Sequence, residues 1–139
     1  MKIAVDFDGT IVEHEYPKIG KIKLFAFETL KELNSQGEQL VLWTFRSGKY
    51  LDEAVEFCKK HGVEFYAINS NFKNERFDGT FSRKINADIF IDDRNLGGFP
   101  GWAIVWKLLK KDSRINPLDS EGLWCDEFSK KKKKFLKIF

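Results

Sequence analysis

Two aspartates near the start of the chain, Asp6 and Asp8, follow directly after the apolar run Ile3-Ala4-Val5. Side chains at positions i and i+2 of an extended chain point to the same side, so this spacing brings the two carboxylates together. Gly9 then permits a tight turn, and Thr10 adds a hydroxyl. Two like charges held close together repel, which predicts a cation between them, a shared proton, or both. An acidic turn without further role is the alternative that this motif alone leaves open.

Polar residues also follow two later apolar runs, the predicted strands at residues 39–43 and 85–91. Thr44 comes after the first run, and Asp92 and Asp93 come after the second. Helix-length segments separate the apolar runs, which predicts parallel strands joined by crossovers. Ligands of such open sheets bind outside the carboxyl ends of the strands. We therefore expect these polar residues and the first two aspartates to meet at one edge of a sheet.

The combined set offers four carboxylates, one amine and one hydroxyl, from Asp6, Asp8, Asp92, Asp93, Lys84 and Thr44. Carboxylates form a hard oxygen site suited to Mg²⁺, and the lysine and hydroxyl suit phosphoryl oxygens. A carboxylate that attacks a phosphoryl group meets charge repulsion, which Mg²⁺ and Lys84 would neutralise. The acyl phosphate that results is open to water, and Asp8 is placed to protonate the leaving group and then activate that water.

At this point the sequence resembles a known family. Asp6-Phe7-Asp8-Gly9-Thr10 is similar to the first motif of the haloacid dehalogenase (HAD) superfamily, Asp-x-Asp-x-Thr. Thr44 resembles its second motif, Lys84 its third, and Asp92-Asp93 the paired-aspartate form of its fourth. The resemblance implies a Rossmann-like α/β fold with a doubly wound, mainly parallel sheet and helices on both faces. It also implies Mg²⁺ and phosphoryl transfer through an aspartyl phosphate.

The resemblance further implies a role for each matching acidic residue. Asp6 would be the nucleophile, and Asp8 would be the general acid and base. The Asp6 side chain, the Asp8 backbone carbonyl and the acidic pair would hold the metal, with Asp93 favoured as the direct ligand and Asp92 acting through water. Asp8 favours a phosphatase, because dehalogenase members of the family lack an acid/base residue at that position.

Phosphate binding is the second role that the resemblance implies. Thr44 would hold a phosphate oxygen, helped by the backbone N–H groups of Phe45 and of Phe7 or Asp8. Lys84 would bridge the phosphoryl group and the nucleophile.

Several neighbouring residues have two interpretations. Arg46 either contacts the substrate or is a solvated loop arginine, and the ring of Phe45 is a candidate for stacking on the substrate. We expect Arg94 to neutralise the acidic pair, His14 to be a surface residue, and Trp43 to pack in the core.

Hydrophobic spacing predicts the elements that position these residues. Helices are expected at residues 23–36 and 50–61, a further strand at residues 64–68, and a loop at residues 69–82. The first helix would bury one face, made of Leu24, Phe27, Leu30 and Leu33. Residues 102–106 suit either a strand or the start of a helix.

The intervals between Thr10 and Thr44 and between Thr44 and Lys84 leave no room for the cap domain that many HAD enzymes carry. The resemblance therefore suggests an open site that accepts large phosphorylated substrates, or one that borrows a lid. A second subunit would supply that lid in a homo-oligomer. A short flap at residues 13–20 and the loop at residues 69–82 are the alternatives within the chain.

The composition is that of one globular domain of 139 residues, with a catalytic core at 1–110 and an extension at 111–139. The net charge of +3 is concentrated in lysines 130–134, so we expect a solvated tail and no strong nucleic-acid signal. No apolar run has the length of a membrane span or of a signal peptide. Cys58 and Cys125 lack metal-ligand spacing and are expected to be reduced thiols of a cytoplasmic protein.

These observations predict a Mg²⁺-dependent phosphatase that hydrolyses a phosphomonoester through an aspartyl phosphate. The alternatives are a nucleotidase or sugar-phosphate phosphatase whose lid comes from a flap or second subunit, and a non-catalytic phosphate-binding module of the same fold.

Overall fold

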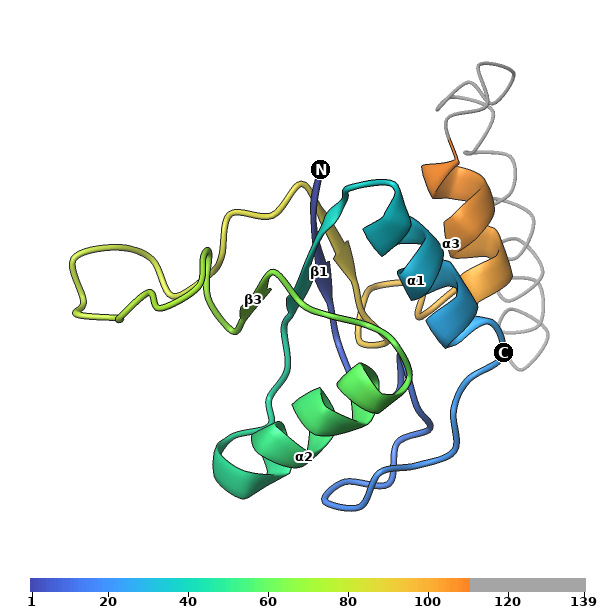
Figure 1. Cartoon of the computed structure of the whole chain (residues 1–139), viewed down its shortest axis with the longest axis horizontal. Coiled ribbons are helices and arrows are strands. Elements are labelled where there is room, and N and C mark those ends of the chain that lie inside the picture. Colours follow the sequence, from blue (N-terminus) through green and yellow to red (C-terminus); the bar gives the residue numbers. More distant parts are fainter. Residues whose placement is uncertain (111–139) are drawn as a thin grey trace, which may run out of the picture. The chain divides into compact units, whose positions relative to one another are not determined.

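The computed structural model describes residues 1–110, so the predicted extension at 111–139 lies outside the described residues. The chain divides into two compact units, Met1–Trp102 and Ala103–Phe139. Seven elements follow one another within residues 1–110, and Figure 1 shows the first unit's central sheet. Their bounds are β1 Lys2–Val5, α1 Ala26–Ser35, β2 Gln39–Leu42, α2 Gly48–Lys60, β3 Ala67–Ile68, β4 Ile89–Ile91 and α3 Trp102–Leu109.

The four strands form one sheet in the order β3-β2-β1-β4, and every pairing is parallel. The predicted α/β class with a parallel sheet is therefore confirmed. In the register of the sheet, Val5 at the end of β1 lies opposite Leu42 of β2 and Ile91 of β4. The residues that follow these three strand ends consequently emerge side by side.

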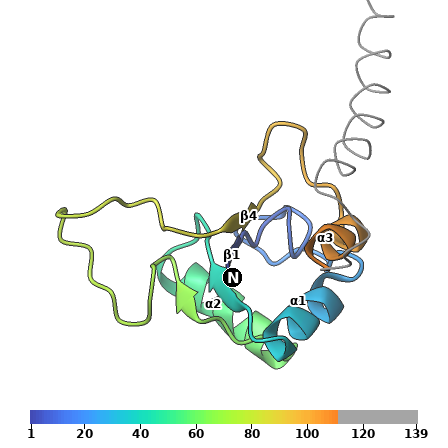
Figure 2. The ribbon, with the colours of Figure 1, turned by 90° about the horizontal axis from the view of Figure 1, so that it is seen from above.

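The two faces of the sheet are covered differently. Helices α1 and α2 lie on the same side of the sheet (Figure 2), as expected when two right-handed crossovers step in the same direction. On one face the strands place fully buried aliphatic side chains, namely Ile3, Val5, Leu40 and Leu42. Because α1 and α2 both lie on one face of the sheet, the doubly wound arrangement with helices on both faces stays a prediction.

The opposite face is covered by irregular chain. Its buried cluster consists of Ala4, Val41, Ala67 and Ile85, and Trp43, Ala87 and Phe90 pack against it half-buried. Between β3 and β4 the chain runs through a long irregular segment, green to yellow in Figure 1, where the loop at residues 69–82 was predicted. The small side chains of Ala4 and Ala67 allow this segment to approach the sheet.

Several boundaries differ from the sequence-based expectation. Strand β4 begins at Ile89 instead of residue 85, and α2 spans Gly48–Lys60 instead of residues 50–61. Helix α1 begins at Ala26 instead of residue 23, because Phe25 adopts the left-handed conformation with φ +64° and cannot continue a helix. Leu24 is consequently 76% exposed, whereas Phe27, Leu30 and Leu33 are buried as predicted. Strand β3 is confined to two residues, and the ambiguous segment after residue 101 is the helix α3.

No helix within residues 1–110 is long and apolar enough to cross a membrane.

We expect Leu40→Ala to lower the free energy of unfolding by about 2–5 kcal/mol, because Leu40 is fully buried and the shortened side chain leaves a cavity. The matched control is Leu24→Ala at the 76% exposed position, which should change it by no more than about 0.5 kcal/mol. Urea unfolding of both variants checks the prediction. Equal losses would contradict the assigned start of α1.

Candidate active site

The backbone ladder of the sheet continues one residue beyond the strands and holds the ends of β1, β2 and β4 side by side. The N–H of Asp6 donates to the carbonyl of Ile91 at 2.9 Å, and the N–H of Trp43 donates to the carbonyl of Val5 at 2.9 Å. The N–H of Thr44 then leaves the ladder and donates to Oδ1 of Asn69 at 2.8 Å. The carboxyl ends of β1, β2 and β4 thus meet at one edge, as the sequence predicted.

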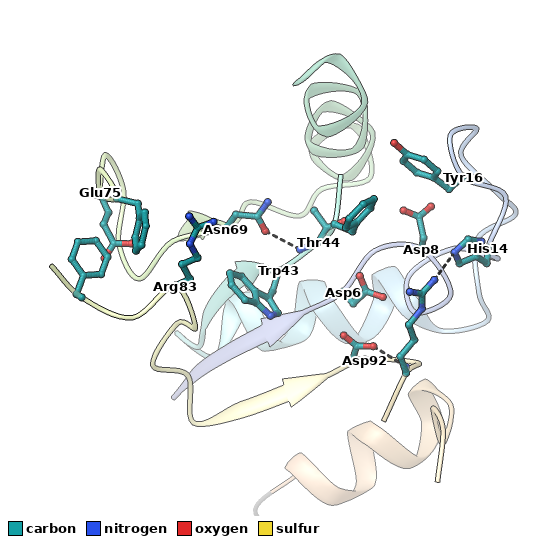
Figure 3. Close-up of a pocket in the computed structure, with 14 residues that line it drawn as sticks. Asp6, Asp8, His14, Tyr16, Trp43, Thr44, Asn69, Glu75, Arg83 and Asp92 are labelled. Atoms are coloured by element: carbon teal, nitrogen blue, oxygen red, sulfur yellow. Dashed lines mark hydrogen bonds between the residues drawn. The ribbon is translucent and has the colours of Figure 1, made fainter. Parts of the chain in front are cut away.

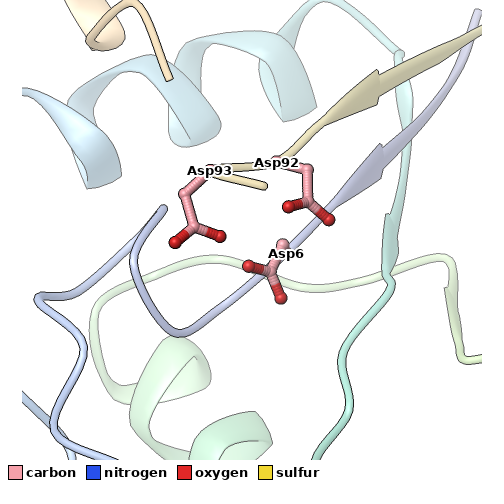
Figure 4. Close-up of side chains that lie close together, drawn as sticks. All are labelled: Asp6, Asp92 and Asp93. Carbon is pink, nitrogen blue, oxygen red and sulfur yellow. The ribbon is translucent and has the colours of Figure 1, made fainter. Parts of the chain in front are cut away.

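Three carboxylates gather at this edge. Ligand oxygens of Asp6, Asp92 and Asp93 all lie within 4.8 Å of one another, and all three side chains are half-buried (Figure 4). Burial raises the pKa of Asp6 from 3.8 to about 7, and the negative charge of Asp92 and the hydrogen bond and charge of Asp93 add to this increase. A hydrogen bond from the backbone of Phe7 acts in the opposite direction. The cluster is therefore electrostatically costly without a cation.

The surroundings of the cluster fit a metal ion. Within the described residues, Oδ1 of Asp93 is buried without a hydrogen-bond partner. Gly9 lies against the same carboxylate, where a Cβ would overlap Oδ2 of Asp93, and its φ of +85° favours glycine. The hydroxyl of Thr10 donates to Oδ2 of Asp6 at 3.3 Å. Three clustered carboxylates with an unpaired oxygen are a donor set for a hard cation such as Mg²⁺.

Asp8 lies in a buried ion pair with Arg46. Nε of Arg46 donates to Oδ2 of Asp8 at 2.7 Å, and Nη2 donates to Oδ1 at 2.8 Å. The two residues are 9% and 1% exposed. This bidentate geometry gives Asp8 one fixed position beside the acidic cluster.

The same guanidinium joins three segments. It donates to the carbonyls of Pro17 at 3.0 Å and Lys18 at 2.8 Å in the flap, and to that of Tyr50 in α2 at 3.4 Å. The structure thereby corrects both interpretations of Arg46. Its side chain is neither solvated nor open to a substrate, because buried protein acceptors already surround it.

Thr44 and Phe45 follow β2 at this edge of the sheet, and their phosphate-binding role stays a prediction. The hydroxyl of Thr44 accepts a hydrogen bond from the N–H of Arg46 at 3.2 Å, which orients it at the end of β2. The ring of Phe45 is 90% exposed. Both residues line a pocket that also includes Asp6 and Asp8.

Lys84 lies near Phe90, on the sheet face opposite helices α1 and α2, and not at the acidic cluster. Its Nζ is 5.4 Å from the centre of the Phe90 ring, and no ion pair within residues 1–110 joins it to Asp6. The preceding residue, Arg83, lines the pocket instead, with its guanidinium 4.7 Å from the centre of the Phe77 ring. The catalytic role of Lys84 stays a prediction.

Arg94 also differs from its expected role. Its backbone N–H donates to Oδ1 of Asp92 at 2.8 Å, but its Nη2 lies 3.4 Å from Nε2 of His14 in the flap. Among the ion pairs of residues 1–110, none joins its guanidinium to the acidic pair. Arg94 and His14 both line the pocket, where Figure 3 labels His14.

The pocket that contains these residues has a volume of about 750 Å³. Sequence reasoning missed a group of its lining residues that come from the flap and from the segment between β3 and β4. They are Tyr16, Asn69, Glu75, Phe77, Phe81 and Arg83. The dense phenylalanine and arginine content of residues 72–83 was the available signal.

Comparison with known proteins identifies a close structural relative. No protein-family model matches the chain, and no curated protein matches it. The solved structure of a conserved protein from Bacteroides thetaiotaomicron is 54% identical in sequence and has a TM-score of 0.76. The match covers 80% of this chain and 90% of that chain, so it extends over most of both proteins.

The pKa of Asp6 predicts a pH-dependent stability of the metal-free protein. Its value is 3.8 in the unfolded chain and about 7 in the fold, so between these values only the folded protein holds the proton. Asp6 therefore contributes a loss of stability as the pH rises from about 4 to about 7, by at most about 1.4 kcal/mol per pH unit. Asp6→Asn should remove this loss, as measured by urea unfolding in EDTA.

The matched control for that measurement is Asp52→Asn, which removes an exposed carboxylate on α2. It should retain the pH dependence of the wild type. An identical pH dependence in wild type and Asp6→Asn would contradict the assigned proton.

Arg46→Met should lower the free energy of unfolding by about 3–5 kcal/mol, because it leaves the charge of Asp8 buried without a partner. Adding Asp8→Asn to this variant should restore part of the loss. The control is Lys23→Met, which breaks the more exposed pair of Lys23 with Glu13 at 3.5 Å and should cost less than about 1 kcal/mol. Urea unfolding of the three variants measures these changes in the free energy of unfolding. Similar losses in Arg46→Met and Lys23→Met would contradict the stabilising role of the buried pair of Asp8 with Arg46.

Proposed function

This chain belongs to the same family as the conserved Bacteroides thetaiotaomicron protein, and we propose that it is a Mg²⁺-dependent HAD-type phosphatase. Its substrate is a phosphomonoester, which it hydrolyses through an aspartyl phosphate on Asp6. The observation that carries the proposal is the meeting of Asp6, Asp92 and Asp93 in one cluster beside Thr44. The order of the four HAD-like motifs in the sequence supports the same function, and with it a doubly wound sheet of the HAD type.

The acidic cluster is the proposed metal site. The side chains of Asp6, Asp92 and Asp93 would hold Mg²⁺, together with the backbone carbonyl of Asp8. When bound, the ion supplies positive charge against the carboxylates and the phosphoryl oxygens. The unpaired Oδ1 of Asp93 favours this residue as a direct ligand.

The first step transfers the phosphoryl group to the protein. A carboxylate oxygen of Asp6 forms a bond to phosphorus, and the bond between phosphorus and the ester oxygen breaks. The electron pair of that bond stays on the departing oxygen, which takes a proton from Asp8 and leaves as an alcohol. Thr44 and the backbone N–H of Phe45 hold the phosphoryl oxygens during this transfer.

Water completes the cycle in the second step. Asp8, now ionised, accepts a proton from a water molecule whose oxygen attacks the phosphorus. The bond between phosphorus and Asp6 breaks, which returns the carboxylate and releases inorganic phosphate. The sum is one ester and one water converted to one alcohol and one phosphate.

Two basic groups have distinct parts in this proposal. Arg46 positions Asp8 through its bidentate pair and does not touch the substrate. Lys84 neutralises the phosphoryl group once its amine turns from the ring of Phe90 toward Asp6. Lysine suits such a movement because its charge sits on a flexible four-carbon chain.

A non-catalytic phosphate-binding module is the second candidate, and the pair of Asp8 with Arg46 favours it. Both oxygens of Asp8 already accept hydrogen bonds from the guanidinium. A proton taken up by Asp8 therefore weakens one of these charge-assisted bonds. Such a site binds phosphate with the same residues but turns it over slowly or not at all.

Asp6→Asn should abolish Mg²⁺-dependent hydrolysis of an aryl phosphate, because the amide cannot form the aspartyl phosphate. Asp8→Asn should lower kcat by about 10²–10⁴-fold, the usual contribution of a general acid and base. Phosphate release measured with and without Mg²⁺ checks both expectations, and circular dichroism checks the fold of each variant. Turnover by Asp6→Asn at the wild-type rate would exclude the mechanism.

The two candidates separate in a binding measurement. Beryllofluoride with Mg²⁺ mimics the aspartyl phosphate and should raise the melting temperature of the wild type but not of Asp6→Asn. A protein that binds inorganic phosphate without hydrolysis and without a beryllofluoride response would be the binding module.

A further inference from the structure

Exposed aromatic rings are a main feature of the pocket walls. Five of its lining residues are aromatic, namely Tyr16, Trp43, Phe45, Phe77 and Phe81. Phe45 is 90% exposed and Phe77 is 48% exposed, although both would gain by burial. Exposed apolar side chains that gather in a concave site mark a ligand surface.

Apart from Trp43, which Figure 3 labels, the rings form two pairs that come from different segments of the chain. On the flap side, the ring centres of Tyr16 and Phe45 are 6.3 Å apart. On the side of the segment between β3 and β4, those of Phe77 and Phe81 are 5.3 Å apart in an edge-to-face arrangement. The two rings of each pair contact one another, and both belong to the pocket lining.

The polar side chains of these walls are largely occupied by the protein itself. Oδ1 of Asn69 accepts from the N–H of Thr44 at 2.8 Å. Both carboxylate oxygens of Glu75 accept from Asn71, at 2.9 Å from its backbone and 3.0 Å from its side chain. A bare sugar phosphate needs free donors and acceptors for its hydroxyls, and these walls offer mostly ring faces.

Guanidinium groups complete the walls. Arg83 lies over the ring of Phe77, and Nη2 of Arg94 lies 3.4 Å from Nε2 of His14 in the pocket lining. A guanidinium plane stacks on a nucleobase, donates hydrogen bonds to its acceptors, and complements the charge of a phosphate. Aromatic rings interleaved with arginines are the surface that proteins use to hold bases by stacking.

We propose that the phosphomonoester bound at this site is a nucleoside monophosphate. Its phosphate lies at Asp6 and Thr44, and its base lies against the exposed rings, of which Phe45 and Phe77 are the most exposed on the two sides. This inference rests on the proposed function for the position of the phosphate. The pocket volume of about 750 Å³ falls in the range of small-molecule sites and accommodates more than a phosphoryl group.

The test uses the full chain carrying Asp6→Asn, which prevents turnover and removes one charge from the repulsive cluster. Calorimetric titration with Mg²⁺ compares the four nucleoside 5′-monophosphates with ribose 5-phosphate, which has the same phosphate and sugar but no base. We expect at least one nucleotide to bind at least about fivefold more tightly than ribose 5-phosphate, the lower limit of one base stacking on an aromatic ring.

Three further variants locate the base. Phe45→Ala and Phe77→Ala, each added to Asp6→Asn, should reduce or remove the preference for the nucleotide over ribose 5-phosphate. The matched control is Phe72→Ala, in the same segment as Phe77, 52% exposed and outside the pocket lining, which should leave the preference unchanged. Equal binding of ribose 5-phosphate and all four nucleotides, no binding of any nucleotide, or a preference that survives both pocket variants would overturn the inference.

Activity of the wild type keeps this test separate from that of the proposed function. Hydrolysis of aryl phosphate without any preference for nucleotides would leave the phosphatase standing and reject the nucleoside. Base-dependent binding without hydrolysis of any nucleotide would retain the nucleoside site and reject the phosphatase.

Discussion

The parallel pairing of β1 with β2 on one side and β4 on the other is the constraint on which the site depends. Three mutually repelling carboxylates and the end of β2 come together only because this register brings Val5, Leu42 and Ile91 level with one another. The backbone ladder continues past Val5 on both sides, so the hydrogen bonds of the sheet offset the repulsion of the acidic cluster. Burial of the aliphatic face against the helices makes a slip of one residue costly, because it would turn that face outward.

A second constraint acts across the chain through Arg46. Its guanidinium donates to Asp8 after β1, to the flap and to the first turn of α2. It also lies 5.0 Å from the centre of the Phe7 ring and 5.2 Å from that of the Tyr16 ring. The buried guanidinium of Arg46 thus connects three segments outside the strands and holds them in their relative positions. The catalytic proposal uses this arrangement, since an acid/base group is effective only when its position is defined.

The spacing of apolar and polar residues along the chain made much of the fold and of the site predictable. The parallel sheet and the meeting of Asp6, Asp92 and Asp93 at one edge follow from short-range patterns. The carboxylate of Asp8, which was expected to join that of Asp6, pairs with Arg46 instead. The environment of Arg46 was not predictable, because backbone carbonyls of Pro17 and Lys18 leave no mark in the sequence as acceptors. The choice between Lys84 and Arg83 at the pocket likewise depends on which way an irregular segment turns, and no periodicity specifies that. The predicted start of α1 was wrong for a similar reason, since the left-handed conformation of Phe25 is unusual for its residue type.

The attachment of the flap to Arg46 has a consequence for access to the site. Opening a lid requires that its contacts break and reform in each cycle, but here two flap carbonyls share a buried cation with Asp8. Lifting the flap would remove two of the acceptors of that buried guanidinium, the carbonyls of Pro17 and Lys18, and each lost hydrogen bond to a charged donor costs about 1.5–3 kcal/mol. We therefore expect the flap to keep its position while ligands bind and leave. Ligands would then enter and leave past the exposed ring of Phe45 without a movement of the flap.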